Sequence, residues 1–140
     1  KAYATVKDNT DSGQFRAIQK AGIKAFNNTS ITEKTISKYS RRFDLLVDAL
    51  NETGFRTKKP KGSFYCYVKA PSGTEDGKVF NTASEFSEFL IKESLISTVP
   101  WDDAGKYVRF SVTFEAEDIG KERQVIDEMK RRIKKLKLKF

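Results

Sequence analysis

The sequence predicts an α/β fold, a two-layer sandwich in which helices cover a small mixed, mostly antiparallel sheet. Three observations lead to this prediction. In several segments apolar residues recur every three or four positions, as in helices with one buried face. In others they alternate with polar residues, as in half-buried strands. The segments follow the order helix, helix, strand, strand, helix, strand, strand, helix along the 140 residues.

Composition points to one domain with a well-filled interior. The chain is 38% hydrophobic and contains eleven Phe and five Tyr, which argues against disorder. The single Cys66 cannot form an internal disulfide, which predicts a cytoplasmic protein. With no His and one Cys, these residues lack the usual zinc sites and the Ser-His and Cys-His nucleophile pairs. No apolar run reaches the roughly 18 to 20 residues that span a bilayer.

Two helices are expected before the first strand. Asp11, with Gln14 three residues later, is the predicted cap of the first. Its apolar face would contain Phe15, Ile18, Gly22 and Phe26. A second capping box, Ser30 with Glu33, opens a longer helix that Gly54 can end in the left-handed conformation. The predicted buried side of this longer helix comprises Ile36, Tyr39, Phe43, Leu46, Val47 and Leu50.

From Phe55 the apolar period changes to two. Residues 55–60 and 64–70 are predicted strands, joined by a hairpin turn at residues 60–63. The polar stretch 71–77 is a predicted surface loop. A capping box at Thr82–Glu85 then starts a short helix, and residues 95–99 form the next predicted strand. The short helix carries Phe86, Phe89 and Leu90.

Arg109 lies within the last predicted strand, Tyr107–Phe114. Alternation places Val108, Phe110, Val112 and Phe114 on one face and Tyr107, Arg109, Ser111 and Thr113 on the other. A guanidinium held on a strand is a two-pronged donor suited to a planar carboxylate or phosphate. The alternative is an exposed arginine paired with a neighbouring acid. The pattern leaves both interpretations open.

The net charge of +8 is concentrated at the end of the chain. Residues 121–140 contain nine Lys and Arg against three acids. The same segment carries an apolar stripe at helical spacing, made of Val125, Ile126, Met129, Ile133, Leu136 and Phe140. We therefore favour a solvated amphipathic helix here over a nucleic-acid or membrane surface, because aromatic residues are not interleaved with the basic ones.

Five motifs occur in the order and spacing seen at the C-terminal end of fold-type I aminotransferases. They are Asp11-Ser12-Gly13-x-Phe15, Arg41-Arg42-x-x-Leu45-Leu46, Gly54-Phe55, Pro60-Lys61-Gly62-Ser63-Phe64-Tyr65 and Val108-Arg109-Phe110-Ser111. Over nearly its whole length the chain resembles the small domain of a class I/II, pyridoxal-phosphate-dependent aminotransferase. Within that family it looks most like LL-diaminopimelate and aspartate aminotransferases.

This resemblance implies that residues 1–140 are one domain, the C-terminal small domain of a longer enzyme. Residues 1–29 would be its interdomain helix region and 30–140 its core. The parent would transfer an amino group between an amino acid and a 2-oxo acid, with Arg109 binding the substrate α-carboxylate. Asn9, Thr10 and Ser12 would lie near the active site of the partner subunit in a homodimer.

The resemblance also implies what this chain does not contain. The large domain of the same polypeptide would hold pyridoxal phosphate and the Schiff-base lysine. This chain would then supply no catalytic residue, bind no cofactor or metal by itself and be inactive alone.

The chain departs from the family pattern in the loop of residues 100–105, where many relatives have Pro-Gly and then Phe-Gly. The role of this loop is open, and Trp101, Tyr65 and Tyr67 are interpreted as packing residues. The residues do not identify the amino donor or acceptor. Two other functional classes stay open: a free-standing α/β module that binds a small molecule or protein, and a basic nucleic-acid-binding module.

Overall fold

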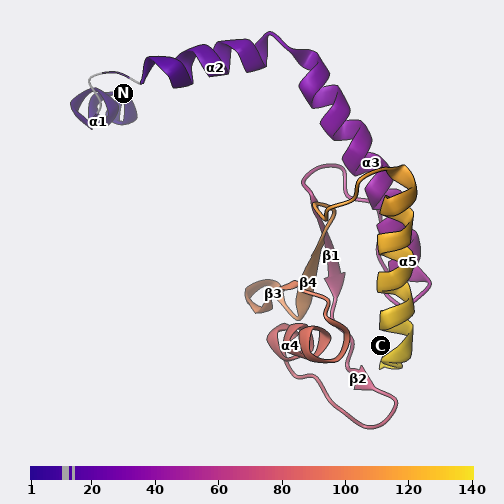
Figure 1. Ribbon diagram of the computed structural model, residues 1–140. Helices are drawn as coiled ribbons and strands as arrows, with labels where there is room; N and C mark the ends of the chain where they lie inside the picture. The colour runs from indigo at the N-terminus through magenta and orange to yellow at the C-terminus, as the bar shows by residue number, and fades with distance from the viewer. Residues whose placement is uncertain (11–12, 14) are drawn as a thin grey trace. The chain divides into compact units, whose positions relative to one another are not determined.

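The structure is a computed structural model that describes residues 1–10, 13 and 15–140 (Figure 1). It contains two compact units, Lys1–Ser37 and Lys38–Phe140. The boundary between them falls within the long helix α3 (Thr29–Asn51). No helix in the described part of the chain is long and apolar enough to cross a membrane.

The first unit is helical, and none of its described side chains is buried. It contains α1 (Ala2–Thr10), α2 (Arg16–Phe26) and the start of α3. The sequence predicted two helices before the first strand, so α1 is an additional one. Its few apolar residues give no clear helical period, which is why it was missed. The exposed large apolar residues of α1 and α2 are Tyr3, Val6, Ile18, Ile23 and Phe26.

The start of α2 has no side-chain cap among the described residues. The helix begins at Arg16, and its N-cap residue Phe15 makes no side-chain hydrogen bond to it. The predicted cap, Asp11 with Gln14, lies outside the described residues.

Helix α3 starts earlier than predicted and buries a shorter stripe. The side-chain oxygen of Asn28 accepts the Ser30 N–H at 3.2 Å, so Asn28 has the capping role predicted for Ser30. After α3, Gly54 has a φ of 97°, the predicted left-handed conformation. Phe43, Leu46 and Leu50 are buried as predicted, and Tyr39 and Val47 pack against the core. Ile36 is 62% exposed, so its predicted burial is wrong.

The main sheet of the second unit has three antiparallel strands. β1 (Tyr65–Lys69) and β3 (Val99–Trp101) pair with opposite edges of β4 (Tyr107–Ser111), giving the order β1-β4-β3. Figure 1 shows these strands beside α4 and α5. This arrangement confirms the predicted α/β fold with a small antiparallel sheet and covering helices.

A second, two-stranded sheet lies where the sequence predicted a surface loop. β2 (Gly73–Thr74) pairs antiparallel with β5 (Leu138–Lys139), and Thr74 is buried. The prediction of a loop at residues 71–77 is therefore wrong at β2. Its partner strand is distant in the sequence, and a local pattern cannot reveal such a pairing.

Residues 55–60 form no strand, and residues 60–63 form no hairpin turn. Phe55 is buried in the core. The Asn51 side chain then accepts the Thr57 N–H at 2.9 Å and donates to the Thr57 carbonyl at 3.2 Å. Asn51 on α3 thus takes both backbone hydrogen bonds of Thr57, and residues 55–60 form no ladder with β1.

Helix α4 (Ala83–Ser94) has the predicted capping box. Glu85 N–H donates to the Thr82 hydroxyl, and the Glu85 carboxylate accepts the Thr82 N–H in return. At its other end Leu95 adopts the left-handed conformation and donates its N–H to Ile91. Residues 95–98 therefore finish the helix and lead away from it. The predicted strand at 95–99 is wrong except at Val99, where β3 begins.

The core lies between one face of the three-stranded sheet and the helices of the second unit. Helix α5 (Ile119–Lys135) runs beside the second half of α3 (Figure 1) and contributes buried Ile126 and Ile133. Val125 and Phe140 are 38% and 52% exposed, so their predicted burial is wrong. Phe140 lies beyond α5, where its ring packs edge-on against Phe55 at 4.8 Å. Central core residues include Phe43, Leu46, Leu50, Phe86, Leu90, Val108, Phe110 and Val112.

Candidate functional site

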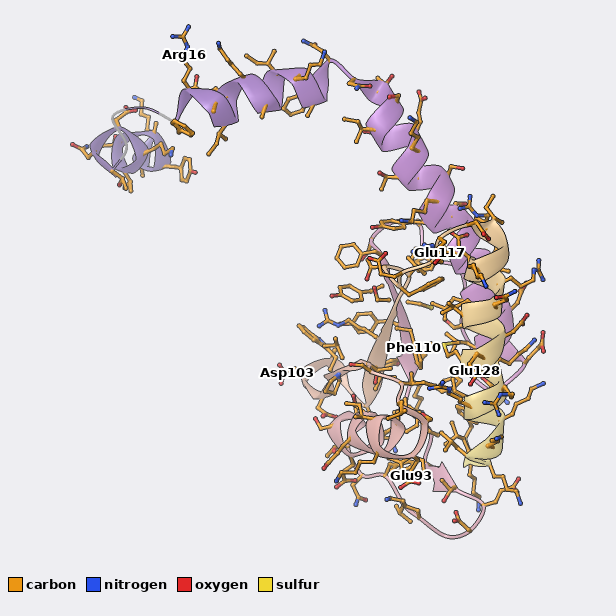
Figure 2. All side chains as sticks on the ribbon, viewed as in Figure 1. Arg16, Glu93, Asp103, Phe110, Glu117 and Glu128 are labelled. Carbon is orange, nitrogen blue, oxygen red and sulfur yellow. The ribbon has the colours of Figure 1, made fainter. Side chains whose placement is uncertain are left out.

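Arg109 lies in the middle of the three-stranded sheet. It is paired with Tyr67 on β1 and with Val99 on β3. Its neighbours Val108 and Phe110 are buried on the core side, so Arg109 is on the opposite face, as alternation predicted. In Figure 2 the labelled Phe110 lies between the sheet and α5, and ring side chains gather on the other side of the sheet.

Three aromatic rings surround the Arg109 guanidinium. Its central carbon lies 4.3 Å from the ring centre of Trp101, 4.7 Å from that of Tyr65 and 5.9 Å from that of Tyr67. Trp101 and Tyr67 also contact each other edge-on. A cation above such rings is attracted by their electron-rich faces. The three residues interpreted from the sequence as packing residues therefore pack on the arginine itself.

No described residue hydrogen-bonds to the N–H edge of this guanidinium. Among the described residues, Arg109 makes no hydrogen bond or ion pair, and its Nε is a buried donor without an acceptor. Arg131 and Arg132, in contrast, both bind Glu128. Within the described chain, Arg109 is therefore not paired with a neighbouring acid, which was the alternative interpretation of the sequence. An unmade buried hydrogen bond costs about 1 to 3 kcal/mol, so this site favours an acceptor from outside the described chain.

The loop after β3 is attached to the start of α4 through Asp102. Its carboxylate accepts the Ala83 N–H at 2.6 Å, the Ser84 N–H at 3.2 Å and the Ser84 hydroxyl at 2.8 Å. The hydrogen bond from Ala83, then those from Ser84, lower the pKa of Asp102 below its ordinary value. Sequence reasoning missed this role because the partners lie 18 and 19 residues earlier in the chain.

A second buried polar cluster supports the chain just beyond β4. Glu122 on α5 accepts hydrogen bonds from Arg41 at 2.7 and 3.0 Å and from Arg42 at 2.8 Å. Arg42 also donates to the carbonyls of Val112 and Phe114. The hydrogen bonds from Arg41, followed by that from Arg42, lower the pKa of Glu122 to about 2, although burial alone would raise it.

The three residues expected near the active site of a partner subunit are in the first unit or outside the described chain. The Asn9 side chain donates to the Thr5 carbonyl at 2.7 Å, and the Thr10 hydroxyl donates to the Val6 carbonyl at 2.8 Å. Both side chains thus bind the backbone of α1. Ser12 lies outside the described residues. A role for these residues near a substrate stays a prediction.

A basic cavity of about 370 Å³ lies near the end of β1. Its cationic lining residues are Arg56, Lys69 and Lys106, and Lys106 donates to the Phe80 carbonyl at 2.8 Å. The lining includes no described carboxylate that could hold the pyridine nitrogen of pyridoxal phosphate. Within the described residues, this cavity therefore lacks a partner for that ring nitrogen. The described residues contain no group of three or more His, Cys, Asp or Glu that could hold a metal ion.

Much of the positive charge at the end of the chain is already paired. Glu128 binds Arg131 and Arg132, and Glu52 on α3 lies 3.2 Å from Lys130 and 3.7 Å from Lys134. This pattern fits the predicted solvated amphipathic helix better than a nucleic-acid surface, where the cations would face phosphates.

The chain is similar to known proteins along its whole length. It is 52% identical to an LL-diaminopimelate aminotransferase of Methanococcus maripaludis and 50% identical to one of Methanocaldococcus jannaschii. Both matches cover 100% of this chain and 35% of the relative. No protein-family model matches the chain.

Solved structures show the same fold. The aspartate aminotransferase of Rhizobium meliloti aligns with a TM-score of 0.74 and 26% identity, over 96% of this chain and 34% of that one. The chain therefore spans about a third of the length of the curated relatives and solved structures it matches.

Proposed function

Since this chain belongs to the aminotransferase family, in which it matches the C-terminal third of the LL-diaminopimelate enzymes, we propose that Arg109 binds the α-carboxylate of an amino-acid substrate. The parent would be a pyridoxal-phosphate-dependent aminotransferase, with this chain as its small domain. LL-diaminopimelate is the proposed amino donor because the relatives from Methanococcus maripaludis and Methanocaldococcus jannaschii both carry that name. A 2-oxo acid would accept the amino group.

The unpartnered Nε of Arg109 carries this proposal. Backbone pairing on both edges of β4 fixes the position of the Arg109 backbone. A carboxylate can accept two parallel hydrogen bonds from one guanidinium, which fixes its orientation as well as its position. An ammonium group cannot reproduce that geometry.

Chemistry on the amino group would be divided between this chain and the rest of the parent. Pyridoxal phosphate, when bound, supplies an electron sink for the bond that breaks at the substrate α-carbon. The cavity lined by Arg56, Lys69 and Lys106 offers no described carboxylate for its pyridine nitrogen, and we propose that the large domain holds it. Arg109 would orient the α-carbon by holding the adjacent carboxylate, and the rings around it would exclude water.

The exposed apolar residues of α1 and α2 support a large domain as partner. Ile18, Ile23 and Phe26 are exposed on one short helix, which is unusual unless another surface covers them. We propose that the rest of the polypeptide covers these residues and that the parent is a homodimer. The lone, buried Cys66 supports a cytoplasmic parent.

Kinetics of the full-length parent would test the role of Arg109. We expect Arg109→Lys and Arg109→Ala to lower kcat/KM for LL-diaminopimelate by about 30-fold to several thousand-fold, the equivalent of about 2 to 5 kcal/mol. Arg123→Lys, at an exposed position on α5, is the matched control and should leave kcat/KM unchanged. Near-normal kcat/KM in Arg109→Ala would refute the assignment.

A further inference from the structure

Trp101 and Tyr65 approach Arg109 from the two strands that flank it. Trp101 lies at the end of β3 and Tyr65 at the start of β1, on opposite sides of β4. Their ring centres lie 4.3 and 4.7 Å from the guanidinium carbon. Rings that stack on a guanidinium leave its N–H edge free, so they restrict its rotation without occupying its donors.

The position of Trp101 depends on the residue that follows it. β3 has only three residues, and after Trp101 the chain leaves the sheet in a short 3₁₀ turn, Asp102–Ala104. Asp102 binds the first two backbone amides of α4, which have no partner within the helix itself. The positive end of the helix dipole favours the ionised carboxylate there. The loop is therefore attached to the core helix immediately after the indole.

We infer that Trp101 and Asp102 are positioning residues for Arg109: the indole stacks on the guanidinium, and the Asp102 carboxylate fixes the indole by binding the start of α4. This inference rests on the proposed function, because it concerns how Arg109 is aimed at a carboxylate. Both residues would act through Arg109 and not on the substrate itself. The loop that departs from the family pattern thus has a specific role in this chain.

The first test needs no substrate or cofactor. In the ¹⁵N-labelled 140-residue chain, the Nε–H resonance of Arg109 can be assigned by its loss in Arg109→Lys. We expect a displaced, slowly exchanging resonance, because the Nε is buried and the rings are adjacent. Trp101→Ala should move the chemical shift of this resonance toward that of a free arginine. Trp101→Phe should keep part of the difference.

Asp102→Ala should move the same resonance, whereas Asp103→Ala should not. Asp103 is the matched control because it is the next acid in the same turn and is exposed. Backbone amide spectra of each variant establish that the fold is intact, and Trp101→Phe preserves an aromatic ring if Trp101→Ala disturbs it. An unchanged Arg109 resonance in folded Trp101→Ala or Asp102→Ala would overturn the inference.

The second test uses the full-length enzyme with LL-diaminopimelate as the probe. Trp101→Ala and Asp102→Ala should raise KM about tenfold with a smaller change in kcat, and Trp101→Phe should restore KM to within about threefold. Asp103→Ala should leave both parameters unchanged. In an Arg109→Ala background, Trp101→Ala should have no further effect, because the ring would then have nothing to position.

The outcomes separate the two proposals. Full activity in Arg109→Ala refutes the proposed function, whatever happens at Trp101. If Arg109→Ala loses most of its kcat/KM while Trp101→Ala and Asp102→Ala keep a normal KM, only the positioning role is refuted. The positioning role is also refuted if Trp101→Ala lowers kcat/KM by the same factor with and without Arg109. If the unaltered enzyme does not turn over LL-diaminopimelate, the proposed donor is wrong and the Arg109 resonance decides the positioning role.

Discussion

Arg42 and Glu122 form a buried ion pair in which Nε of Arg42 lies 2.8 Å from Oε1 of Glu122. Both side chains are almost fully buried, and the Arg42 guanidinium also lies 4.3 Å from the ring centre of Phe114. The pair joins α3 to α5, and Arg42 also binds the carbonyls that follow β4. Glu122 accepts hydrogen bonds from both Arg41 and Arg42, so its buried charge is compensated.

Replacing Glu122 should destabilise the fold strongly. Glu122→Gln leaves Arg42 charged and buried beside a neutral partner, and breaking such a pair typically costs about 3 to 5 kcal/mol. Urea unfolding of the 140-residue chain measures the change. The control is Glu128→Gln, which removes two partly exposed ion pairs on the same helix and should change stability little. If both substitutions lowered the free energy of unfolding equally, burial would not explain the effect of Glu122→Gln.

The Glu122 carboxyl group should also make the free energy of unfolding depend on pH. The pKa of Glu122 is about 2 in the folded chain and about 4.3 for an unfolded glutamate. Its stabilising effect is therefore complete above the unfolded pKa and is lost as the pH falls through the folded pKa. Between about pH 5 and pH 2, the free energy of unfolding should fall more steeply in the unaltered chain than in Glu122→Gln. Urea titrations at several pH values measure both slopes, and parallel curves would rule this out.

Arg109→Met should remove the proposed function without harming the fold. The substitution deletes an unsatisfied buried donor and keeps a long side chain that can pack on the surrounding rings. The free energy of unfolding should be unchanged or rise by up to about 1 kcal/mol, while kcat/KM of the parent falls. Denaturation curves beside kinetics measure the two effects. A loss of stability with normal activity would return Arg109 to a purely structural role.

The 140-residue chain alone should retain no pyridoxal phosphate. Its described residues offer lysines and an arginine around one cavity but no described carboxylate in its lining for the pyridine nitrogen. After incubation with the cofactor and dialysis, we expect no visible absorption to remain. The full-length parent, treated in the same way, is the positive control. One equivalent held by a single lysine of the chain would show that the assignment of the cofactor to the large domain is wrong.

Local sequence patterns predicted helix starts that are capped by nearby residues, and strands whose two faces differ strongly in polarity. The alternation in Tyr107–Phe114 correctly placed Arg109 away from the core, and the Thr82–Glu85 box correctly located the start of α4. The pattern at residues 55–60 was misleading, because the Thr57 backbone binds Asn51 and Phe55 is buried in the core. Alternation describes which side chains are apolar, and it does not say which partner takes the backbone hydrogen bonds.

The surroundings of Arg109 could not be predicted in this way. Tyr65, Trp101 and Arg109 meet only because β1 and β3 pair with β4 in one particular register. Glu122 meets Arg42 across 80 positions of the sequence. Such contacts depend on strand order and helix packing, which a single sequence leaves undetermined. The face of the strand on which Arg109 lies was predictable, whereas the aromatic rings around Arg109 were not.

Because Arg109 Nε is a buried donor without a described acceptor, binding of a carboxylate there should change the melting temperature of the chain. A carboxylate that supplied the missing acceptor would bind the folded chain and not the unfolded one. By mass action the melting temperature would then rise with ligand concentration, by an amount set by the dissociation constant. Small carboxylic acids could thus be ranked by thermal shift before any catalytic assay exists.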